Sequence, residues 1–320
     1  MKTLLLALAP EHIPPAILEQ IGWLAPDLRL AVTNDRAEIE ALLDDVVIAA
    51  GSVPPDLVVC APALRWYQQW GAGADWLLRY PQAVDQEFIL TSASGVHAVP
   101  ISEQIIGALL MFARGLHRAV RAQTRQEWWR PAQDELFELP GKTMLVIGVG
   151  AIGARTAELA SALGMRVEGL RRNPDWPAPG VAALYGPDRL HERLGQADVV
   201  VLTVPLSAET RGMIGPAELR AMRPGAYLIN IGRGGTVDEP ALIQALSSGR
   251  LAGAALDVFA EEPLPAESPL WSLEQVILTA HYAGATPHYD ERALAIFLDN
   301  LGRFQAGEPL RNLVDKARGY

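Results

Sequence analysis

The chain contains 320 residues, of which half are hydrophobic and a fifth charged, which excludes a disordered chain and predicts two domains with sizeable cores. It has 27 Lys and Arg against 37 Asp and Glu, and this net charge of −10 argues against nucleic acid or an anionic membrane as its main partner. The single cysteine, Cys60, excludes an internal disulfide and a zinc site built from several thiolates.

The first part of the sequence alternates short apolar runs with stretches of helical character. The run LLLALA after Lys2 is shorter than the hydrophobic region of a signal peptide, about 7–15 residues, so we interpret it as a strand. Cys60 closes another apolar run, where we predict a buried strand thiol. The predicted strands are residues 3–8, 28–32, 57–60 and 88–91. They indicate a small α/β unit, followed by one long helix from Ile101 to about Arg125.

A second and stronger alternation of strands and helices begins after Pro140 and Gly141. Several of its apolar runs are continuous, as expected for strands that are covered by helices on both faces of a sheet. The predicted strands are residues 143–147, 165–170, 198–204, 226–231, 253–257 and 276–279, with a final helix over 288–305. Because helices fall between the strands, we predict a parallel, doubly wound sheet. No apolar run approaches the roughly 18 residues of a membrane-spanning helix, so we expect a cytoplasmic protein without a membrane partner.

The segment GVGAIG, residues 148–153, matches the dinucleotide-binding fingerprint GxGxxG. It follows a predicted strand and opens a helix rich in alanine, which is the context that the motif requires. Glycines there let backbone N–H groups approach a pyrophosphate at the helix N-terminus. The alternative is a plain glycine turn between a strand and a helix. We predict as cofactor-binding residues Gly148, Gly150, Ala151, Ile152 and Gly153.

The end of the next predicted strand differs from the pattern of NAD-binding proteins. An acidic residue that binds the ribose of NAD is expected about 20 residues beyond the glycines. Instead, two arginines, Arg171 and Arg172, stand there, and the only acid of the strand, Glu168, lies inside it. Two guanidinium groups suit a 2′-phosphate, which they can bind through paired hydrogen bonds. We therefore expect both arginines to bind the cofactor, with NADP(H) favoured over NAD(H).

Polar side chains follow the last three predicted strands. Arg233 follows the first of these strands, Glu262 lies shortly after the second, and His281 follows the third. Ligands bind at the carboxyl ends of strands in such sheets, so the three side chains are expected to meet. Each one also has an alternative interpretation without a catalytic role: Arg233 as a side chain on a glycine turn, Glu262 as the cap of a loop and His281 as a structural histidine.

Together the three residues suit the reduction of a 2-keto acid. An Arg can bind the carboxylate through two hydrogen bonds and polarise the adjacent carbonyl. A protonated His can donate to the developing alkoxide, and a Glu beside it would stabilise the protonated ring and hold its tautomer. A nicotinamide would supply the hydride, while the protein supplies position and charge. We predict Arg233, Glu262 and His281 as the catalytic residues, and no metal site.

These motifs resemble those of the D-isomer-specific 2-hydroxyacid dehydrogenase family and, within it, of the glyoxylate/hydroxypyruvate reductases. The resemblance rests on GVGAIG, INIGRGGTVDE, DVFAEEPLP and the late His281, with support from residues 72–75 and 95–98. It implies an oxidoreductase that transfers a hydride from NAD(P)H to the carbonyl of a small 2-keto acid, giving the D-2-hydroxy acid. It also implies a Rossmann cofactor domain, residues 98–283, inserted in a smaller flavodoxin-like substrate domain, residues 1–97 and 284–320.

The resemblance further implies roles for individual residues. Arg233 would bind the substrate carboxylate and keto oxygen, and His281 would be the acid in reduction and the base in oxidation, with Glu262 as its partner. The other implied contacts are made with substrate by Ala72, Gly73 and Ala74, and with cofactor by Val204, Pro205 and Asp257.

The family is usually homodimeric, with an arm that would here be residues 121–140 and would carry Trp128 and Trp129. Many members place a proline before the catalytic histidine, where this chain has Ala280. Two other functions stay open: the same fold acting on another small anion such as phosphite or formate, or a nicotinamide-sensing interaction protein. The sequence does not determine which 2-keto acid is the substrate.

Overall fold

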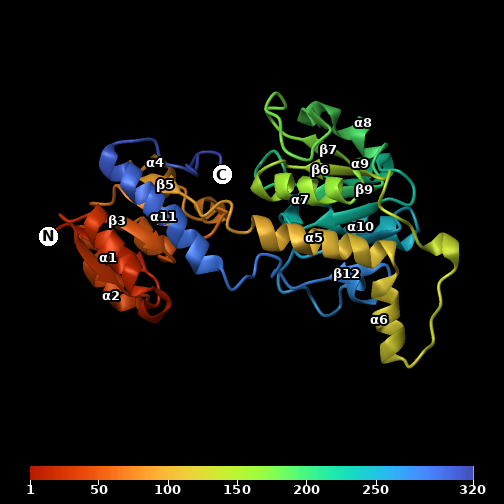
Figure 1. The fold of residues 1–320 in the computed structure, drawn as a ribbon, viewed down its shortest axis with the longest axis horizontal. Coiled ribbons are helices and arrows are strands. Elements are labelled where there is room, and N and C mark those ends of the chain that lie inside the picture. Colours follow the sequence, from red (N-terminus) through yellow and green to blue (C-terminus); the bar gives the residue numbers. More distant parts are fainter. Residues whose placement is uncertain (320) are drawn as a thin grey trace. The chain divides into compact units, whose positions relative to one another are not determined.

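The computed structural model describes residues 1–319, apart from the side chain of His12, and divides into two compact units (Figure 1). The first unit consists of Met1–Val96 together with the segment from Thr286 onward, and the second unit is His97–Ala285. Each unit contains a sheet of parallel strands. Parallel strands need crossover connections, and helices provide most of these connections in both units.

In the described part of the first unit, five parallel strands lie in the order β2-β1-β3-β4-β5, which is the order of flavodoxin-like sheets. The strands are β1 (Thr3–Ala7), β2 (Arg29–Val32), β3 (Val46–Gly51), β4 (Trp66–Gln69) and β5 (Ile89–Thr91). The helices are α1 (Pro15–Leu24), α2 (Arg36–Leu42), α3 (Pro55–Val58), α4 (Gln82–Asp85) and α11 (Tyr289–Ala306). Helix α11 comes from the far end of the chain, and its Phe297 and Leu301 are buried in one cluster with Leu4 and Trp66.

One strand prediction for this unit is wrong. Residues 57–60 do not form a strand, because helix α3 begins at Pro55, and the fixed φ of proline suits the first position of a helix. Leu57 and Val58 are buried by this helix, whereas Cys60 follows it and is exposed, so the prediction of a buried strand thiol is also wrong. The predictions of β1, β2 and β5 are confirmed, each within one residue.

In the described part of the second unit, seven parallel strands lie in the order β12-β11-β10-β9-β6-β7-β8. Counted from β6, this is the Rossmann order with one added strand. The strands are β6 (Thr143–Ile147), β7 (Arg166–Leu170), β8 (Ala183–Tyr185), β9 (Val199–Leu202), β10 (Tyr227–Asn230), β11 (Gly253–Leu256) and β12 (Val276–Leu278). All the strands predicted here are present, and β8 was not predicted. The helices are α5 (Ala98–Ala113), α6 (Leu116–Thr124), α7 (Ala151–Ala162), α8 (Leu190–Leu194), α9 (Pro216–Ala221) and α10 (Glu239–Ser247).

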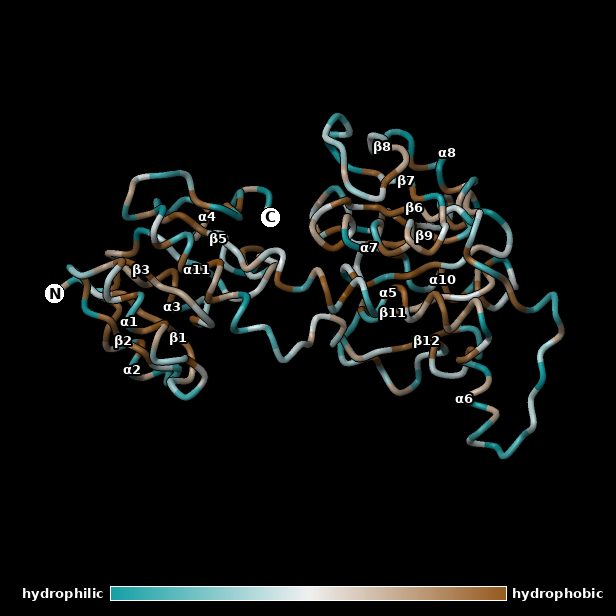
Figure 2. Tube along the Cα trace, viewed as in Figure 1, coloured by the Kyte–Doolittle hydropathy of each residue, from teal (hydrophilic) through white to brown (hydrophobic). Residues whose placement is uncertain are grey.

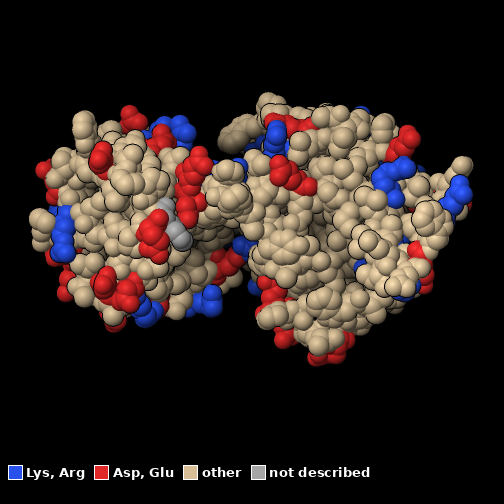
Figure 3. All heavy atoms as spheres, turned by 60° about the horizontal axis from the view of Figure 1, so that its bottom comes forward, with Lys and Arg blue, Asp and Glu red and all other residues tan. Residues whose placement is uncertain are grey.

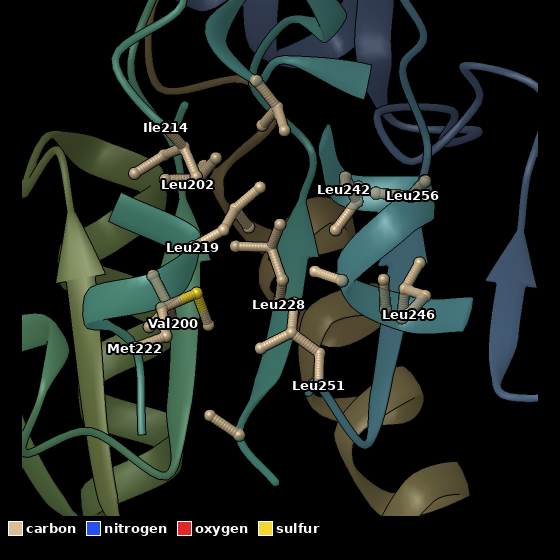
Figure 4. Close-up of a cluster of buried hydrophobic side chains, with 14 of the residues drawn as sticks. Val200, Leu202, Ile214, Leu219, Met222, Leu228, Leu242, Leu246, Leu251 and Leu256 are labelled. Atoms are coloured by element: carbon tan, nitrogen blue, oxygen red, sulfur yellow. The ribbon is translucent and has the colours of Figure 1, made fainter. Parts of the chain in front are cut away.

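Apolar side chains are buried on both faces of this sheet. Val199 and Val201 of β9 lie in a cluster with α5 and α7, while Val200 and Leu202 lie in the opposite cluster with α9 and α10. This alternation follows from the two-residue period of a strand. Figure 4 shows the second cluster, with leucines from β10 and β11 pointing toward those of the helices. In Figure 2 the trace is mainly hydrophobic where the strands are labelled, and many of the connections between elements are more hydrophilic.

The predicted long helix over 101–125 is broken. It forms two helices, α5 and α6, which are bent by 74° at a break containing Gly115, whose φ of 65° is left-handed. Ile105 and Leu109 of α5 are buried, whereas α6 turns away from the sheet (Figure 1) and exposes Leu116 and Val120. Among the described residues no single helix is long and apolar enough to cross a membrane, although the bent pair of α5 and α6 meets the length and composition criteria jointly.

Charged side chains of both signs are interspersed over the faces drawn in Figure 3. Some of these charged side chains stabilise the fold through ion pairs and hydrogen bonds, and two arginines of α6 are examples. Arg118 pairs with Glu135 at 3.0 Å, and Arg121 donates to the backbone carbonyl of Val276, in the edge strand β12, at 2.7 Å. These contacts tie α6 to the segment that follows it and to the edge of the sheet.

Candidate active site

The glycine loop connects β6 to α7 at the carboxyl end of the sheet. Gly148 has a φ of 99°, and a Cβ there would lie 2.7 Å from Cγ1 of Val204. Its carbonyl accepts a hydrogen bond from the Thr203 hydroxyl at 2.5 Å, which ties the loop to the end of β9. A Cβ at Gly150, the residue before α7, would meet nothing within 4 Å. The loop therefore leaves space at the N-terminus of a helix, an arrangement that suits a pyrophosphate.

Four further residues predicted to bind the cofactor lie around this loop. Ala151 and Ile152 form the first turn of α7. Val204 and Pro205 follow β9, and the Pro205 carbonyl accepts a hydrogen bond from the Thr210 hydroxyl at 2.6 Å. The residues predicted from β6 and β9 therefore lie at the same edge of the sheet, because parallel strands end together.

Two arginines follow β7, the strand beside β6. The Arg171 guanidinium lies 5.9 Å from the centre of the Trp176 ring and donates to the Trp176 carbonyl at 3.4 Å. Arg172 pairs at 2.7 Å with Glu209, whose side chain is 72% exposed. Both arginines thus lie where a Rossmann sheet meets the adenosine ribose of its cofactor.

Glu168, the acid inside β7, is engaged by the protein itself. It is only 4% exposed, and its carboxylate accepts a hydrogen bond from Arg166 at 3.0 Å. It also pairs with the buried Arg193 at 3.4 Å. A buried carboxylate held between two guanidinium groups acts as a structural ion pair.

Arg233 follows β10 in a turn that neighbouring residues hold. The amide of Asn230 donates to the Arg233 carbonyl at 3.2 Å, and the Thr236 hydroxyl donates to the same carbonyl at 2.7 Å. The next residue, Gly234, packs so closely on Phe259 that a Cβ there would lie 1.9 Å from its carbonyl carbon. This backbone contact joins the turn of Arg233 to the loop after β11.

The Arg233 charge acts on two neighbouring titratable groups, Glu262 and His97. Nδ1 of His97, which is half-buried, lies 3.1 Å from the Gly284 carbonyl. Burial lowers the pKa of His97 and the Arg233 charge lowers it further, against the raising effect of the Gly284 hydrogen bond. His97 is therefore neutral at neutral pH and holds the start of α5 to the segment after His281.

His281 and Glu262 form a hydrogen-bonded pair. Nδ1 of His281 lies 2.7 Å from one carboxylate oxygen of Glu262, and the other oxygen accepts from the backbone N–H of Phe259 at 3.0 Å. Burial raises the pKa of Glu262, but the hydrogen bonds from His281 and Phe259 and the charges of His281 and Arg233 outweigh it and hold this pKa below its usual value. Because the pair uses Nδ1, the other ring nitrogen, Nε2, is the one that can face a substrate.

The loop of His281 is attached to Asp257, which is only 2% exposed. The Asp257 backbone carbonyl accepts from the N–H of His281 at 2.9 Å. Its carboxylate accepts from the N–H groups of Tyr282, at 3.2 Å, and Ala283, at 3.0 Å. Asp257, predicted from the family resemblance as a cofactor residue, thus has its carboxylate engaged by the protein.

The predicted substrate loop, with Ala72, Gly73 and Ala74, belongs to the first unit. The buried Gln69 at the end of β4 donates to the carbonyls of Gly71, at 3.0 Å, and Gly73, at 2.8 Å. The ring nitrogen of Trp76 donates in turn to the Gln69 side chain at 2.8 Å. A buried amide therefore fixes the conformation of this glycine loop.

The sequence analysis missed the residues that support those it predicted. Asn230 and Thr236 lie three residues either side of Arg233, and such a local pattern could have been recognised, because Asn and Thr commonly bond to nearby backbone groups. Glu209, by contrast, lies 37 residues from Arg172, and nothing local connects the two.

Comparison with known proteins agrees with this geometry. Residues 106–283 match the sequence profile of the NAD-binding domain of D-isomer-specific 2-hydroxyacid dehydrogenases. The chain belongs to this family. It is 35% identical over 295 residues to a glyoxylate reductase of Korarchaeum cryptofilum, and the aligned region covers 89% of this chain and 87% of that protein. The dehydrogenase is therefore an oxidoreductase that uses a nicotinamide cofactor.

Two solved structures share the fold of the dehydrogenase. One is an NADPH-dependent glyoxylate/hydroxypyruvate reductase of Sinorhizobium meliloti, solved with NADP and sulfate, with a TM-score of 0.83, 28% identity and 100% of both chains covered. The other is a D-isomer-specific 2-hydroxyacid dehydrogenase of Xanthobacter autotrophicus, solved with NADPH and MES, with a TM-score of 0.82, 28% identity and 100% and 99% covered. The predicted fold class, a Rossmann unit with a smaller parallel-sheet unit, is thereby confirmed.

Proposed function

We propose that this dehydrogenase reduces a small 2-keto acid of the glyoxylate or hydroxypyruvate type to the D-2-hydroxy acid, with NADPH as its preferred reductant. The observation that carries the proposal is the 2.7 Å pair of His281 and Glu262, with the Arg233 charge beside it, on a sheet that has a dinucleotide loop. The relative from Korarchaeum cryptofilum and the reductase of Sinorhizobium meliloti support this substrate class.

The residues at the carboxyl edge of the Rossmann sheet fit a nicotinamide dinucleotide. Backbone N–H groups from Gly150 to Gly153 would hold the pyrophosphate, in the space that a Cβ at Gly150 would enter without contact. Val204 and Pro205 would line the adenine side. When bound, the reduced nicotinamide supplies the hydride.

Three side chains would carry the rest of the reaction. Arg233 binds the substrate carboxylate through paired hydrogen bonds, and its charge polarises the keto oxygen. Protonated His281 donates the proton on Nε2 to that oxygen, so that hydride and proton together convert the carbonyl to a hydroxyl. The Glu262 carboxylate accepts from Nδ1, which stabilises the imidazolium before the transfer and leaves the ring in the Nδ1–H tautomer afterwards.

The preference for NADPH rests on the groups beside the ribose position. Arg171 and Arg172 offer two guanidinium groups for a 2′-phosphate, and the phosphate pairs strongly with such a fork. Glu168, the acid nearest to this position in β7, is buried against Arg166 and Arg193. It therefore cannot serve as the ribose-binding acid of an NAD enzyme.

Two family features complete the proposal. For the loop of Ala72, Gly73 and Ala74 we propose contact with the substrate carboxylate through backbone N–H groups. We also propose a homodimer, in which the segment after α6 packs on a second copy. Trp128 in this segment is 97% exposed, and such a large apolar side chain suits burial in an interface.

The experiment is the oxidation of NADPH and NADH, followed by absorbance, with glyoxylate, hydroxypyruvate and pyruvate as substrates. We expect turnover with NADPH to exceed turnover with NADH, and His281→Gln to lower kcat by about 10²–10⁴-fold, the usual range for loss of a general acid. NADPH binding, measured by fluorescence, should be retained. His191→Gln is the matched control, because His191 is exposed and pairs with Glu218 away from the site. Full turnover in His281→Gln would disprove the assignment of the acid.

A further inference from the structure

A chain of hydrogen bonds reaches the loop of His281 from helix α5. The side-chain nitrogen of Gln104 lies 2.8 Å from the Thr279 hydroxyl and 3.4 Å from the Asp257 carboxylate. The Thr279 hydroxyl lies 2.5 Å from the same carboxylate oxygen. Gln104 lies on α5, Asp257 follows β11 and Thr279 follows β12. Residues that are up to 175 positions apart in the sequence therefore form one polar group.

The direction of these bonds follows from the chemistry of the groups. An ionised carboxylate only accepts, so the single hydroxyl proton of Thr279 is donated to Asp257. The Thr279 oxygen then accepts from Gln104, and only the NH₂ group of the Gln104 amide can donate to it. The order is therefore Gln104 to Thr279 to Asp257, and a residue at position 104 must be a donor.

This group controls the backbone around the proposed acid. Asp257 accepts from the N–H of His281 with its carbonyl and from those of Tyr282 and Ala283 with its carboxylate. His281 has a φ of 52°, a left-handed conformation that costs on the order of 1 kcal/mol and is maintained only where the surroundings fix it. A rotation of the Asp257 carboxylate would shift the two N–H groups it binds and would move His281 relative to Glu262.

Packing leaves room for such a shift. A cavity of about 250 Å³ lies beside the group and is lined by Ile105 and Met111 of α5, by Ile277 of β12 and by Tyr282, together with Gln104. Side chains that border a cavity have fewer contacts to hold them in place than those in a filled core. Hydrogen bonds rather than close packing therefore fix this side of the loop.

We infer that Gln104 is a positioning residue for proton transfer: through Thr279 and Asp257 it fixes the orientation of His281. This inference rests on the proposed function, in which His281 is the acid. The amide nitrogen of Gln104 is engaged by Thr279 and Asp257, so we expect its loss to act through these two residues, to lower kcat and to leave cofactor binding unchanged. A misplacement of about 1 Å can cost roughly 10²-fold in rate, and partial loosening should cost about tenfold.

The test compares steady-state kinetics and NADPH binding in Gln104→Met, which keeps the length and removes the donor, and in Gln244→Met, an exposed matched control on α10. We expect kcat to fall about tenfold in Gln104→Met, with the Kd for NADPH unchanged and Gln244→Met like the wild type.

A second pair of variants tests the middle of the chain of hydrogen bonds. Thr279→Val should likewise lower kcat without changing the Kd for NADPH, and Thr279→Ser, which keeps the hydroxyl, should have the kcat of the wild type. Because the residues act in series, the double variant Gln104→Met with Thr279→Val should lose less than the product of the single losses.

The outcomes separate this inference from the proposed function. If His281→Gln is inactive while Gln104→Met and Thr279→Val keep kcat within twofold of the wild type, the positioning role is wrong and the acid stands. If His281→Gln is active, the proposed acid is wrong and the inference falls with it. If Gln104→Met does not fold, equal kcat in Thr279→Val and Thr279→Ser would still overturn the chain of hydrogen bonds.

Discussion

Two loops at the edge of the same sheet are built in different ways. The loop of His281 is fixed by a buried carboxylate, Asp257, that accepts several hydrogen bonds, whereas the arginines after β7 are held by exposed partners such as Glu209. Losing a partner of a buried charged group costs about 1–3 kcal/mol or more, but an exposed ion pair is worth only about 0–1 kcal/mol. The backbone at the proposed acid is therefore fixed by buried hydrogen bonds, while the residues proposed to select the cofactor rely on exposed contacts that are easily replaced.

The largest effect should follow from a change in the pair of His281 and Glu262. We expect Glu262→Gln to lower kcat about 10²-fold, because the imidazolium of His281 loses its anionic partner. The folded-state pKa of Glu262 is lowered, so the carboxylate contributes stability that is present above its unfolded pKa and is lost as the pH falls through the folded value. Stability and kcat measured against pH should therefore decline on the acid side in the wild type.

This acid-side decline should be smaller in Glu262→Gln, which has no carboxylate to protonate at that position. Glu261→Gln is the control, since Glu261 is exposed and adjacent in sequence. An unchanged kcat in Glu262→Gln would show that the 2.7 Å pair is not used in the reaction.

Glu168→Gln changes the buried ion pair in β7, the strand that precedes Arg171 and Arg172. Removing this charge takes away the buried one of the two carboxylates that pair with Arg193 and leaves only the partly exposed Glu192, so we expect a loss of about 2 kcal/mol in the free energy of unfolding. Thermal and urea unfolding would measure this loss, with Glu158→Gln, in an exposed pair with Arg155, as the control. The KM for NADH should not change; a rise in this KM would mean that Glu168 binds the ribose after all.

Arg171→Ala should have a smaller and selective effect. We expect the Kd for NADPH to rise about tenfold, because one charge-assisted contact to the 2′-phosphate is lost, and the Kd for NADH to stay the same. Fluorescence titration with both cofactors measures the change, and Arg155→Ala on α7 serves as the control. Equal losses for the two cofactors would contradict the 2′-phosphate assignment.

The smallest effect is expected for Glu209→Gln. Glu209 pairs with Arg172 and would compete with the 2′-phosphate for it, so its neutralisation should lower the Kd for NADPH by a factor of about 2–5. The gain should shrink in high salt, because the interaction is exposed and screened. A weaker affinity for NADPH in this variant would show that Glu209 supports Arg172 rather than competing for it.

Sequence patterns were sufficient where one local signal determines the structure. The strands of the Rossmann sheet other than β8 were predictable because residues such as Val199–Leu202 form continuous apolar runs between helices. Strand β4 was missed because it contains Gln68 and Gln69, which are usually exposed. Here Gln68 accepts from Thr91 and Asn300 within the core, and Asn300 lies 232 residues away. Such a partner has no signature in the local sequence.

The same limit applies to the candidate site. The proximity of Arg233, Glu262 and His281 was predictable because each follows a strand end, and parallel strands bring their ends together. The contacts of Gln104 were not predictable, because the sequence of α5 is that of an ordinary buried helix and only the fold brings it to Thr279 and Asp257. Residues 57–60 show the opposite error: an apolar run suggested a strand, but the preceding proline and the packing of Leu57 favoured a helix.

The packing of α11 on the sheet of its own unit, the first unit, has a consequence for synthesis on the ribosome. The apolar surface of β1 and β4 is covered by Phe297 and Leu301, and the N–H of Val314 donates to the carbonyl of Leu90 at 2.9 Å, so the first unit needs residues that are translated after the whole second unit. The second unit is continuous in sequence and has all its strands once residue 278 has emerged. The unit whose strands are made before those of the second unit is thus completed after it, and its exposed core must be kept from aggregation until α11 has been translated.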